Sequence, residues 1–274
     1  MERGARTRTE DSLPQGVGQA IRETAGEIAA LLADATDMTG PVPGLEWTVG
    51  ETAAHLALAN GLMADVASGQ ERPYGDGTPR SIAAANARSL ADFPERTAEP
   101  LAAMIVEQAD RFLDAVGRAT THGTAAQTFL TPLGPLDHST FASYLLTHML
   151  GHGYDLARGL RRPHMINASR VELCLPFLQT AMPRLSAAPE LTARYTLRLR
   201  GGTTFGVTFT DGTVEVLPRA PERPDCTIVT EPVAFLLMGL GRMSPWQAMA
   251  RGAVLAWGRR PWLALRFPEL FHVP

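Results

Sequence analysis

The 274-residue chain contains no lysine, so all 25 of its basic residues are arginine. This absence excludes a lysine Schiff base and the phosphate-binding lysine of a Walker-type loop. Only two cysteines are present, Cys174 and Cys226. They are too few for a disulfide framework and too far apart for a CxxC metal clip. A reduced, cytoplasmic location is therefore expected.

Long apolar runs and excess positive charge are missing as well. No uninterrupted apolar stretch reaches the ~18 residues of a membrane-spanning helix, and none is expected. Residues 1–16 are polar and lack the apolar segment of a secretory signal. The formal net charge of −3 provides no basic field, so neither nucleic acid nor a membrane is expected as a partner.

Length and periodicity favour two modest domains, because the hydrophobic spacing changes along the chain. A spacing of three to four predicts helices in the first part, and a spacing of two predicts strands in the second, with Asp211-Gly212 as a hairpin signal. We expect a helical domain at 15–188 and an α+β domain at 189–274. The predicted helices are 17–35, 49–66, 81–92, 100–119, 138–160, 169–183, 232–240 and 245–250, and the predicted strands lie around 195–199, 205–209, 214–216 and 226–230.

Two capping boxes are predicted, each a hydroxyl residue followed three positions later by a glutamate. Thr48 and Glu51 would begin one helix, and Ser169 and Glu172 another. Trp47, just before the first box, is expected to pack in the core.

Histidine placement carries the clearest chemical signal. His148 and His152 are four residues apart, which places two imidazoles on one helix face, as a shared metal ion requires. His55 can face inward from the helix that begins at Thr48, and Asp155 can accept a ring N–H from the face of His152. The spacing alone leaves open the simpler interpretation that these histidines are surface or satisfied core residues.

The surrounding residues strengthen the metal hypothesis through a resemblance. The segment from Trp47 to Leu56 resembles the W-[ST]-x-x-[DE]-x-x-x-H-[LV] motif of DinB-like four-helix metalloproteins, and the segment from His148 to Ala157 resembles their second ligand pair. The whole pattern is similar to the mycothiol-dependent maleylpyruvate isomerase family. That resemblance implies a DinB-like four-helix bundle followed by a sterol-carrier-like α+β domain. In the isomerase proper, a glutamate usually stands at the place of His148, which puts maleylpyruvate itself in doubt as the substrate.

The resemblance also implies a mechanism. His55, His148 and His152 would hold Zn²⁺ or another divalent metal with one open position, where mycothiol would bind as a thiolate and attack an electrophilic substrate. Whether the outcome is isomerisation or S-transfer stays open, as do the electrophile and a monomeric or homodimeric state. The remaining site residues would be Asp155, which fixes a histidine tautomer, Arg80, which binds a substrate carboxylate, and Tyr144, Asn86 and Arg88, which contact the thiol. Arg80, Asn86 and Arg88 also fit ordinary solvated helix positions.

Two other functions are compatible with the sequence. One is a non-catalytic protein that sequesters a small molecule. The other is a hydrolase that uses metal-bound water, for which Glu51 and Asp155 are the nearby candidate bases. Aromatic side chains of the second domain would fill its core or line an apolar tunnel: Phe205, Phe209, Phe235, Trp246, Trp257 and Trp262.

Overall fold

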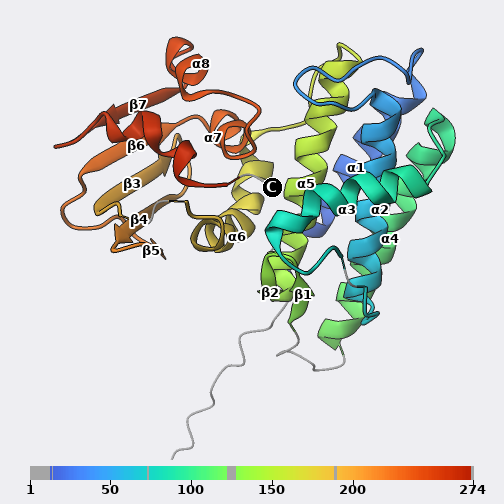
Figure 1. Cartoon of the computed structure of the whole chain (residues 1–274), viewed down its shortest axis with the longest axis horizontal. Coiled ribbons are helices and arrows are strands. Elements are labelled where there is room, and N and C mark those ends of the chain that lie inside the picture. Colours follow the sequence, from blue (N-terminus) through green and yellow to red (C-terminus); the bar gives the residue numbers. More distant parts are fainter. Residues whose placement is uncertain (1–12, 14, 73, 122–127, 188–189, 273–274) are drawn as a thin grey trace, which may run out of the picture.

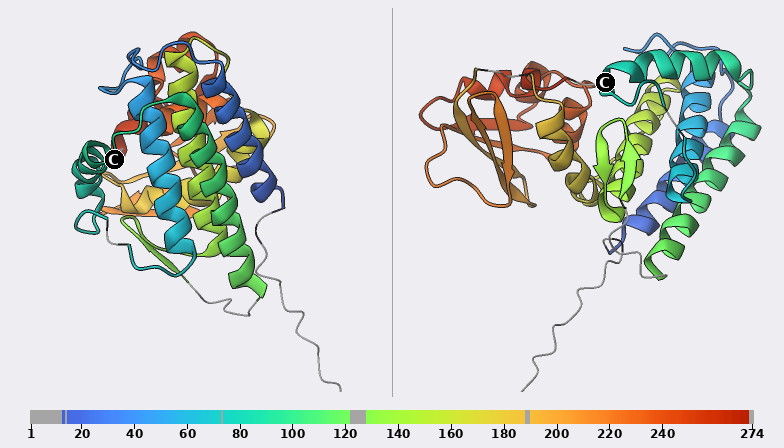
Figure 2. Two further views of the ribbon diagram at one scale, coloured as in Figure 1. Left: turned by 90° about the vertical axis from the view of Figure 1, so that its right-hand side faces the viewer. Right: turned by 60° about the horizontal axis from the view of Figure 1, so that its bottom comes forward.

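The computed structural model describes residues 13, 15–72, 74–121, 128–187 and 190–272. Residues 1–12, on which the signal-peptide prediction rests, and His122 lie outside this set. The chain forms two domains, an N-terminal helical domain and a C-terminal domain built on a mixed sheet, and these lie side by side (Figure 1). The right-hand view of Figure 2 shows the same separation from another direction. None of the described helices combines the length and apolar composition needed to span a bilayer.

Four long helices form the N-terminal bundle, close to their predicted bounds. Their inward faces bury large apolar side chains such as Ile28, Leu56, Phe112 and Phe141, so burial rather than helix propensity stabilises the bundle. The four are α1 (Val17–Ala33), α2 (Val49–Ala67), α4 (Ala98–Thr121) and α5 (His138–Gly159). Between them lie a 3₁₀ turn (Pro79–Ser81), α3 (Ile82–Asp92) and an unpredicted hairpin of β1 (Phe129–Thr131) and β2 (Gly134–Leu136).

Helix α2 begins at the predicted capping box. The Thr48 hydroxyl accepts a hydrogen bond from the Glu51 amide at 3.2 Å, and the Thr48 amide donates to the Glu51 carboxylate at 2.8 Å. These two bonds give hydrogen-bond partners to the amides of Glu51 and Thr48, which have none within the helix. The start of α2 is thereby fixed seven residues before His55.

The second predicted capping box is wrong. Helix α6 (Ala168–Arg184) is capped two residues earlier than expected, because the side chain of Asn167, and not that of Ser169, accepts the capping hydrogen bond, from the Arg170 amide at 3.0 Å. The Glu172 carboxylate instead accepts a bond from the Thr203 amide in the C-terminal domain. A tertiary partner has therefore replaced the local one.

The C-terminal domain is a five-stranded sheet with the order β5-β4-β3-β6-β7. Strands β3 and β6 are parallel and all other neighbours are antiparallel. Asp211 and Gly212 form the predicted hairpin turn with positive φ angles of 46° and 82°. The elements are β3 (Ala193–Leu199), β4 (Thr204–Thr210), β5 (Thr213–Leu217), β6 (Cys226–Thr230), α7 (Pro232–Gly239), α8 (Pro245–Ala250), β7 (Val254–Trp257), α9 (Leu263–Arg266) and a 3₁₀ turn (Pro268–Leu270).

Helix α6 connects the two domains, since it packs on α5 of the bundle and also on β5 and α7. The phenylalanines Phe205, Phe209 and Phe235 are buried, as expected of core residues. The three tryptophans of this domain are instead exposed, so they neither fill its core nor line an enclosed tunnel. A cavity of about 90 Å³ lies between α6 and α7, with apolar walls.

Candidate metal centre

Three histidines from two helices converge at one point of the bundle. His55 extends from α2, and His148 and His152 extend from successive turns of α5. One nitrogen from each ring lies within 4.8 Å of the other two, and the Nε2 atoms of His55 and His148 are 3.2 Å apart. His55 and His148 are 93 residues apart in the sequence, and the packing of α2 against α5 brings them together in space.

The environment of this cluster favours neutral imidazoles. His55 is only 5% exposed, and burial lowers its pKa well below the ordinary value, with the nearby His152 as the second cause. Burial likewise lowers the pKa of His148, again with His152 as the next contribution. A neutral ring keeps a nitrogen lone pair available, which is the form that binds a metal.

The donor set fits a divalent cation. At Zn–N bonds of about 2.0–2.1 Å, two nitrogens of a tetrahedral site lie about 3.4 Å apart, close to the 3.2 Å between His55 and His148. Three imidazoles with no protein-derived fourth ligand in the described cluster leave room for an exogenous ligand, as in catalytic zinc sites. Imidazole donors alone do not select zinc over other divalent metals.

Asp155 supports the cluster from behind. Its carboxylate Oδ2 lies 3.2 Å from Nδ1 of His152, which leaves the other ring nitrogen to face the site. Arg242, from the segment between α7 and α8, donates to both carboxylate oxygens at 2.8 and 3.2 Å. Burial opposes ionisation of Asp155, but the close approach of His152 and the bonds from Arg242 outweigh it and lower the pKa of Asp155. A side chain of the C-terminal domain thus orients a histidine of the bundle.

Trp47 contributes to the site instead of only filling the core. Its ring is half-buried, with its centroid 4.8 Å from that of His55 and 6.2 Å from that of His152. The indole covers one side of the histidine cluster and limits its contact with water.

A cavity opens beside His148. It has a volume of about 70 Å³, and Tyr144, Tyr74 and Ile82 line it together with His148. It shares Arg72, Tyr74 and the β1 end of the hairpin with a larger hollow of about 680 Å³. The arrangement gives a narrow space next to the histidines and a wider one outside it, as a small reactive group on a larger polar molecule would need.

Tyr144 lies in the wall of this cavity. Its ring stacks on Phe177 at 4.3 Å and meets the His148 ring edge-on at 6.4 Å. Burial raises the pKa of Tyr144 to about 12, so its hydroxyl stays protonated and able to donate. Its contact with a bound thiol remains a prediction.

The other predicted contact residues lie farther from the histidines. The Asn86 side chain accepts a hydrogen bond from the Tyr74 hydroxyl, so Asn86 supports a wall of the cavity. Arg88 is exposed, and its charge acts on Tyr74. Arg80 is also exposed and lines a separate hollow of about 890 Å³ with Arg184 and His272. The carboxylate-binding role of Arg80 stays a prediction.

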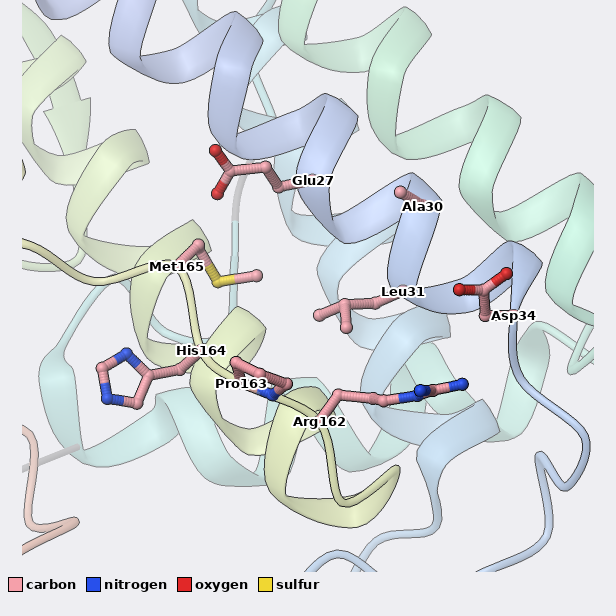
Figure 3. A pocket seen from close by; sticks show the side chains of 8 residues that line it. All are labelled: Glu27, Ala30, Leu31, Asp34, Arg162, Pro163, His164 and Met165. Atoms are coloured by element: carbon pink, nitrogen blue, oxygen red, sulfur yellow. The ribbon is translucent and has the colours of Figure 1, made fainter.

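Another surface hollow lies between α1 and the segment after α5, with a volume of about 340 Å³. Glu27 and Asp34 line it together with Arg162 and His164. Figure 3 shows His164 and Asp34 at opposite ends of this pocket, so they do not form a shared binding group.

The groups required by the hydrolase alternative are engaged elsewhere. Glu51 is bonded to the Thr48 amide and hydroxyl, and Asp155 is bonded to Arg242 and lies beside His152. Both carboxylates have lowered pKa values, Glu51 mainly through the backbone bond from Thr48. A carboxylate held in this way is a weak general base.

The sequence interpretation missed three residues of the site. Arg242 gives no local signal, because its partner Asp155 is 87 residues away. Tyr74 was passed over because it lies in a segment rich in glycine and proline, where a loop was expected. Trp47 belonged to the quoted motif, so the motif itself carried the signal.

Comparisons with known proteins agree with this architecture. Residues 20–157 match the family model described as the mycothiol maleylpyruvate isomerase N-terminal domain, and residues 178–258 match the SCP-2 sterol transfer family. A comparison with curated proteins found no match.

Two solved structures have the same fold. One is a crystal structure of the mycothiol-dependent maleylpyruvate isomerase, at 16% identity and a TM-score of 0.52. The other is a histidine-to-alanine mutant of the mycothiol-dependent maleylpyruvate isomerase, at 15% identity and a TM-score of 0.56. Each comparison covers 91% of this chain and 95% of the other. The chain has a DinB-like bundle in which three histidines come together, and a sterol-carrier-like domain follows it in the sequence. It therefore belongs to the mycothiol maleylpyruvate isomerase family.

Proposed function

We propose that this protein is a metal-dependent enzyme that uses mycothiol as a co-substrate and acts on a small electrophile as an isomerase or S-transferase. The observation that carries the proposal is the convergence of His55, His148 and His152 beside a narrow cavity. Family membership supports mycothiol as the thiol, since the structural relatives are described as mycothiol-dependent.

The three imidazoles would hold a divalent metal, and we propose that this metal is Zn²⁺. When bound, the metal supplies the positive charge that keeps a neighbouring thiol ionised. Asp155, whose Oδ2 is 3.2 Å from Nδ1 of His152, would keep the proton of that ring on Nδ1, and Trp47 would limit contact of water with the cluster. The protonated Tyr144 hydroxyl is available to donate a hydrogen bond at the cavity wall.

We extend the proposal to the outer contacts. The sugar-like part of the thiol would occupy the larger hollow beyond Tyr74, where Asn86 and Arg88 are near enough to influence that wall. A carboxylate on the electrophile would pair with Arg80. We also propose domain boundaries at 15–188 and 189–274. The C-terminal family match begins at 178, within α6, because α6 contacts both domains.

The test is a thiol assay with purified mycothiol and a panel of unsaturated acids and activated electrophiles, on protein loaded with Zn²⁺ and on chelated protein. We expect turnover only with both metal and mycothiol. An isomerase changes the absorbance of the substrate with no net loss of free thiol, whereas an S-transferase consumes thiol in proportion to product.

Variants identify the site. His148→Ala should bind less than about a tenth of the metal bound by the unaltered protein, since loss of one of three ligands removes most of the affinity. His164→Ala is the matched control, because His164 is exposed and outside the cluster. Full metal content in His148→Ala, or turnover by thoroughly chelated protein, would refute the proposal.

A further inference from the structure

Exposed apolar side chains are concentrated in one short segment of the C-terminal domain. Of the six large hydrophobic residues that are exposed among the described residues, five fall within residues 246–262. The sixth is Leu130, on the hairpin of the other domain. We call these five residues the tryptophan patch: Trp246 (66% exposed), Met249 (41%), Leu255 (55%), Trp257 (51%) and Trp262 (59%).

Four of the five residues lie at the edge of the sheet, and Trp262 lies just before α9. Trp246 and Met249 lie on α8, which packs against β7, and Leu255 and Trp257 lie on β7 itself. These two residues of β7 are two apart, so they share one face of the strand. β7 is the last strand in the sheet order, and Figure 1 shows β7 and α8 apart from the helical bundle. The patch is therefore not covered by the N-terminal domain.

The same segment is basic. Residues 243–268 contain four arginines and no acidic residue. Arg251 is exposed and forms no ion pair with any residue that the structure describes, while Arg259 pairs with the buried Asp225 at 2.8 Å. The whole-chain charge of −3 conceals this asymmetry, because residues 189–274 hold ten arginines against seven acids. The expectation of no membrane partner takes into account only the net charge of the whole chain and not the charge of this segment.

Tryptophan and arginine side chains together suit the boundary between lipid headgroups and acyl chains, where an indole places its apolar body and its N–H in different surroundings. In a two-fold symmetric contact, a second copy of this chain would bring the same positive charge to the patch, which disfavours self-association of that kind. From exposure, edge position and charge, we propose that the tryptophan patch with Arg251 and Arg266 docks the protein on the surface of an anionic membrane.

The test uses the full chain and lipid vesicles. The protein should sediment with vesicles of phosphatidylcholine mixed with phosphatidylglycerol and remain in solution with phosphatidylcholine alone. Binding should weaken as salt is added, since the arginines contribute through a screened attraction. Tryptophan emission should shift to shorter wavelength on binding, because three of the four tryptophans lie in the patch and Trp47 lies by the histidines.

Two sets of variants separate the contributions. Trp257→Ala combined with Trp262→Ala should lower the vesicle partition coefficient by about tenfold, as loss of two interfacial indoles predicts. Arg251→Glu combined with Arg266→Glu should abolish the preference for phosphatidylglycerol. The matched controls are Leu130→Ala, an apolar residue that is more exposed than any in the patch, and Arg22→Glu, an exposed arginine of α1, and both should bind as the unaltered protein does.

Far-ultraviolet circular dichroism establishes that each variant is folded. Equal sedimentation with and without phosphatidylglycerol would overturn the proposal. So would a concentration-dependent dimer in solution that Trp257→Ala dissociates, because the patch would then be an interface between copies of the chain.

Discussion

At the scale of single residues, burial decides which groups are chemically available. The same loss of solvent lowers the pKa of His55 and His148 and raises the pKa of the two thiols. It therefore prepares neutral imidazoles for a metal while it suppresses the chain's own nucleophilic sulfur. If the reaction uses a thiolate, as we propose, that thiolate has to come from outside the chain.

The cysteines provide a direct check. Burial raises the pKa of Cys174 to about 12 and that of Cys226 to about 11, so both stay as thiols at neutral pH. We expect no rapid reaction of the native protein with a thiol-specific chromogenic disulfide, and reaction of both cysteines after unfolding in guanidinium. One equivalent of fast-reacting thiol in the folded protein would show that a cysteine is accessible and ionised, contrary to this structure.

At the scale of secondary structure elements, the start of α2 determines where His55 points. The capping box at Thr48 sets the first turn, and the spacing of seven residues then brings His55 to the face that meets α5. Hydrogen bonds from Thr48 hold the pKa of Glu51 below its ordinary value. The ionised form is thus favoured by folding, and its contribution to stability is present above the unfolded pKa and lost as pH falls through the folded pKa.

Thr48→Ala should reduce the free energy of unfolding by about 1 kcal/mol, because the helix loses its capping hydroxyl. Urea unfolding followed by circular dichroism measures the loss. The difference between the variant and the unaltered protein should shrink in acid, where Glu51 is protonated in both. Thr39→Ala is a matched control, since its hydroxyl bonds an exposed aspartate outside the helices. An unchanged midpoint in Thr48→Ala would contradict the capping role.

At the scale of the whole molecule, the two domains are joined through the site. Arg242 of the C-terminal domain bonds the buried Asp155 of the bundle, which in turn lies against Nδ1 of His152. The C-terminal domain therefore supports a histidine of the candidate metal centre, a role distinct from any lipid binding of its own.

Arg242→Ala should leave the Asp155 carboxylate buried without its partner, a loss on the order of 3 kcal/mol in the free energy of unfolding. Because His152 loses its fixed support, metal affinity should fall by about tenfold or more. Calorimetric metal titration and urea unfolding measure the two effects. Arg200→Ala, which removes an exposed pair with Glu231 in the same domain, serves as control. Unaltered metal affinity in Arg242→Ala would contradict the prediction that Arg242 supports metal binding through Asp155 and His152.

The sequence by itself determined the features that depend on neighbours along the chain. Hydrophobic spacing located the bundle helices, the period-two strands and the capping box at Thr48, since each arises from residues within a few positions of one another. Motif order indicated the family and the three histidines. The wrong prediction of a second capping box also follows from the use of local signals alone. Ser169 and Glu172 have the complete local pattern, but the Glu172 carboxylate accepts a hydrogen bond from the distant Thr203 amide instead.

Only the tertiary structure decided what depends on residues far apart in the chain. It brought His55 within bonding range of His148, placed Arg242 behind Asp155, and left Trp246, Trp257 and Trp262 on the surface where core packing was expected. The short strand β7 and the β1–β2 hairpin likewise become recognisable only through the strands with which they pair. Packing between elements far apart in the chain, within each domain and between the two, fixes these relations, and no local periodicity records them.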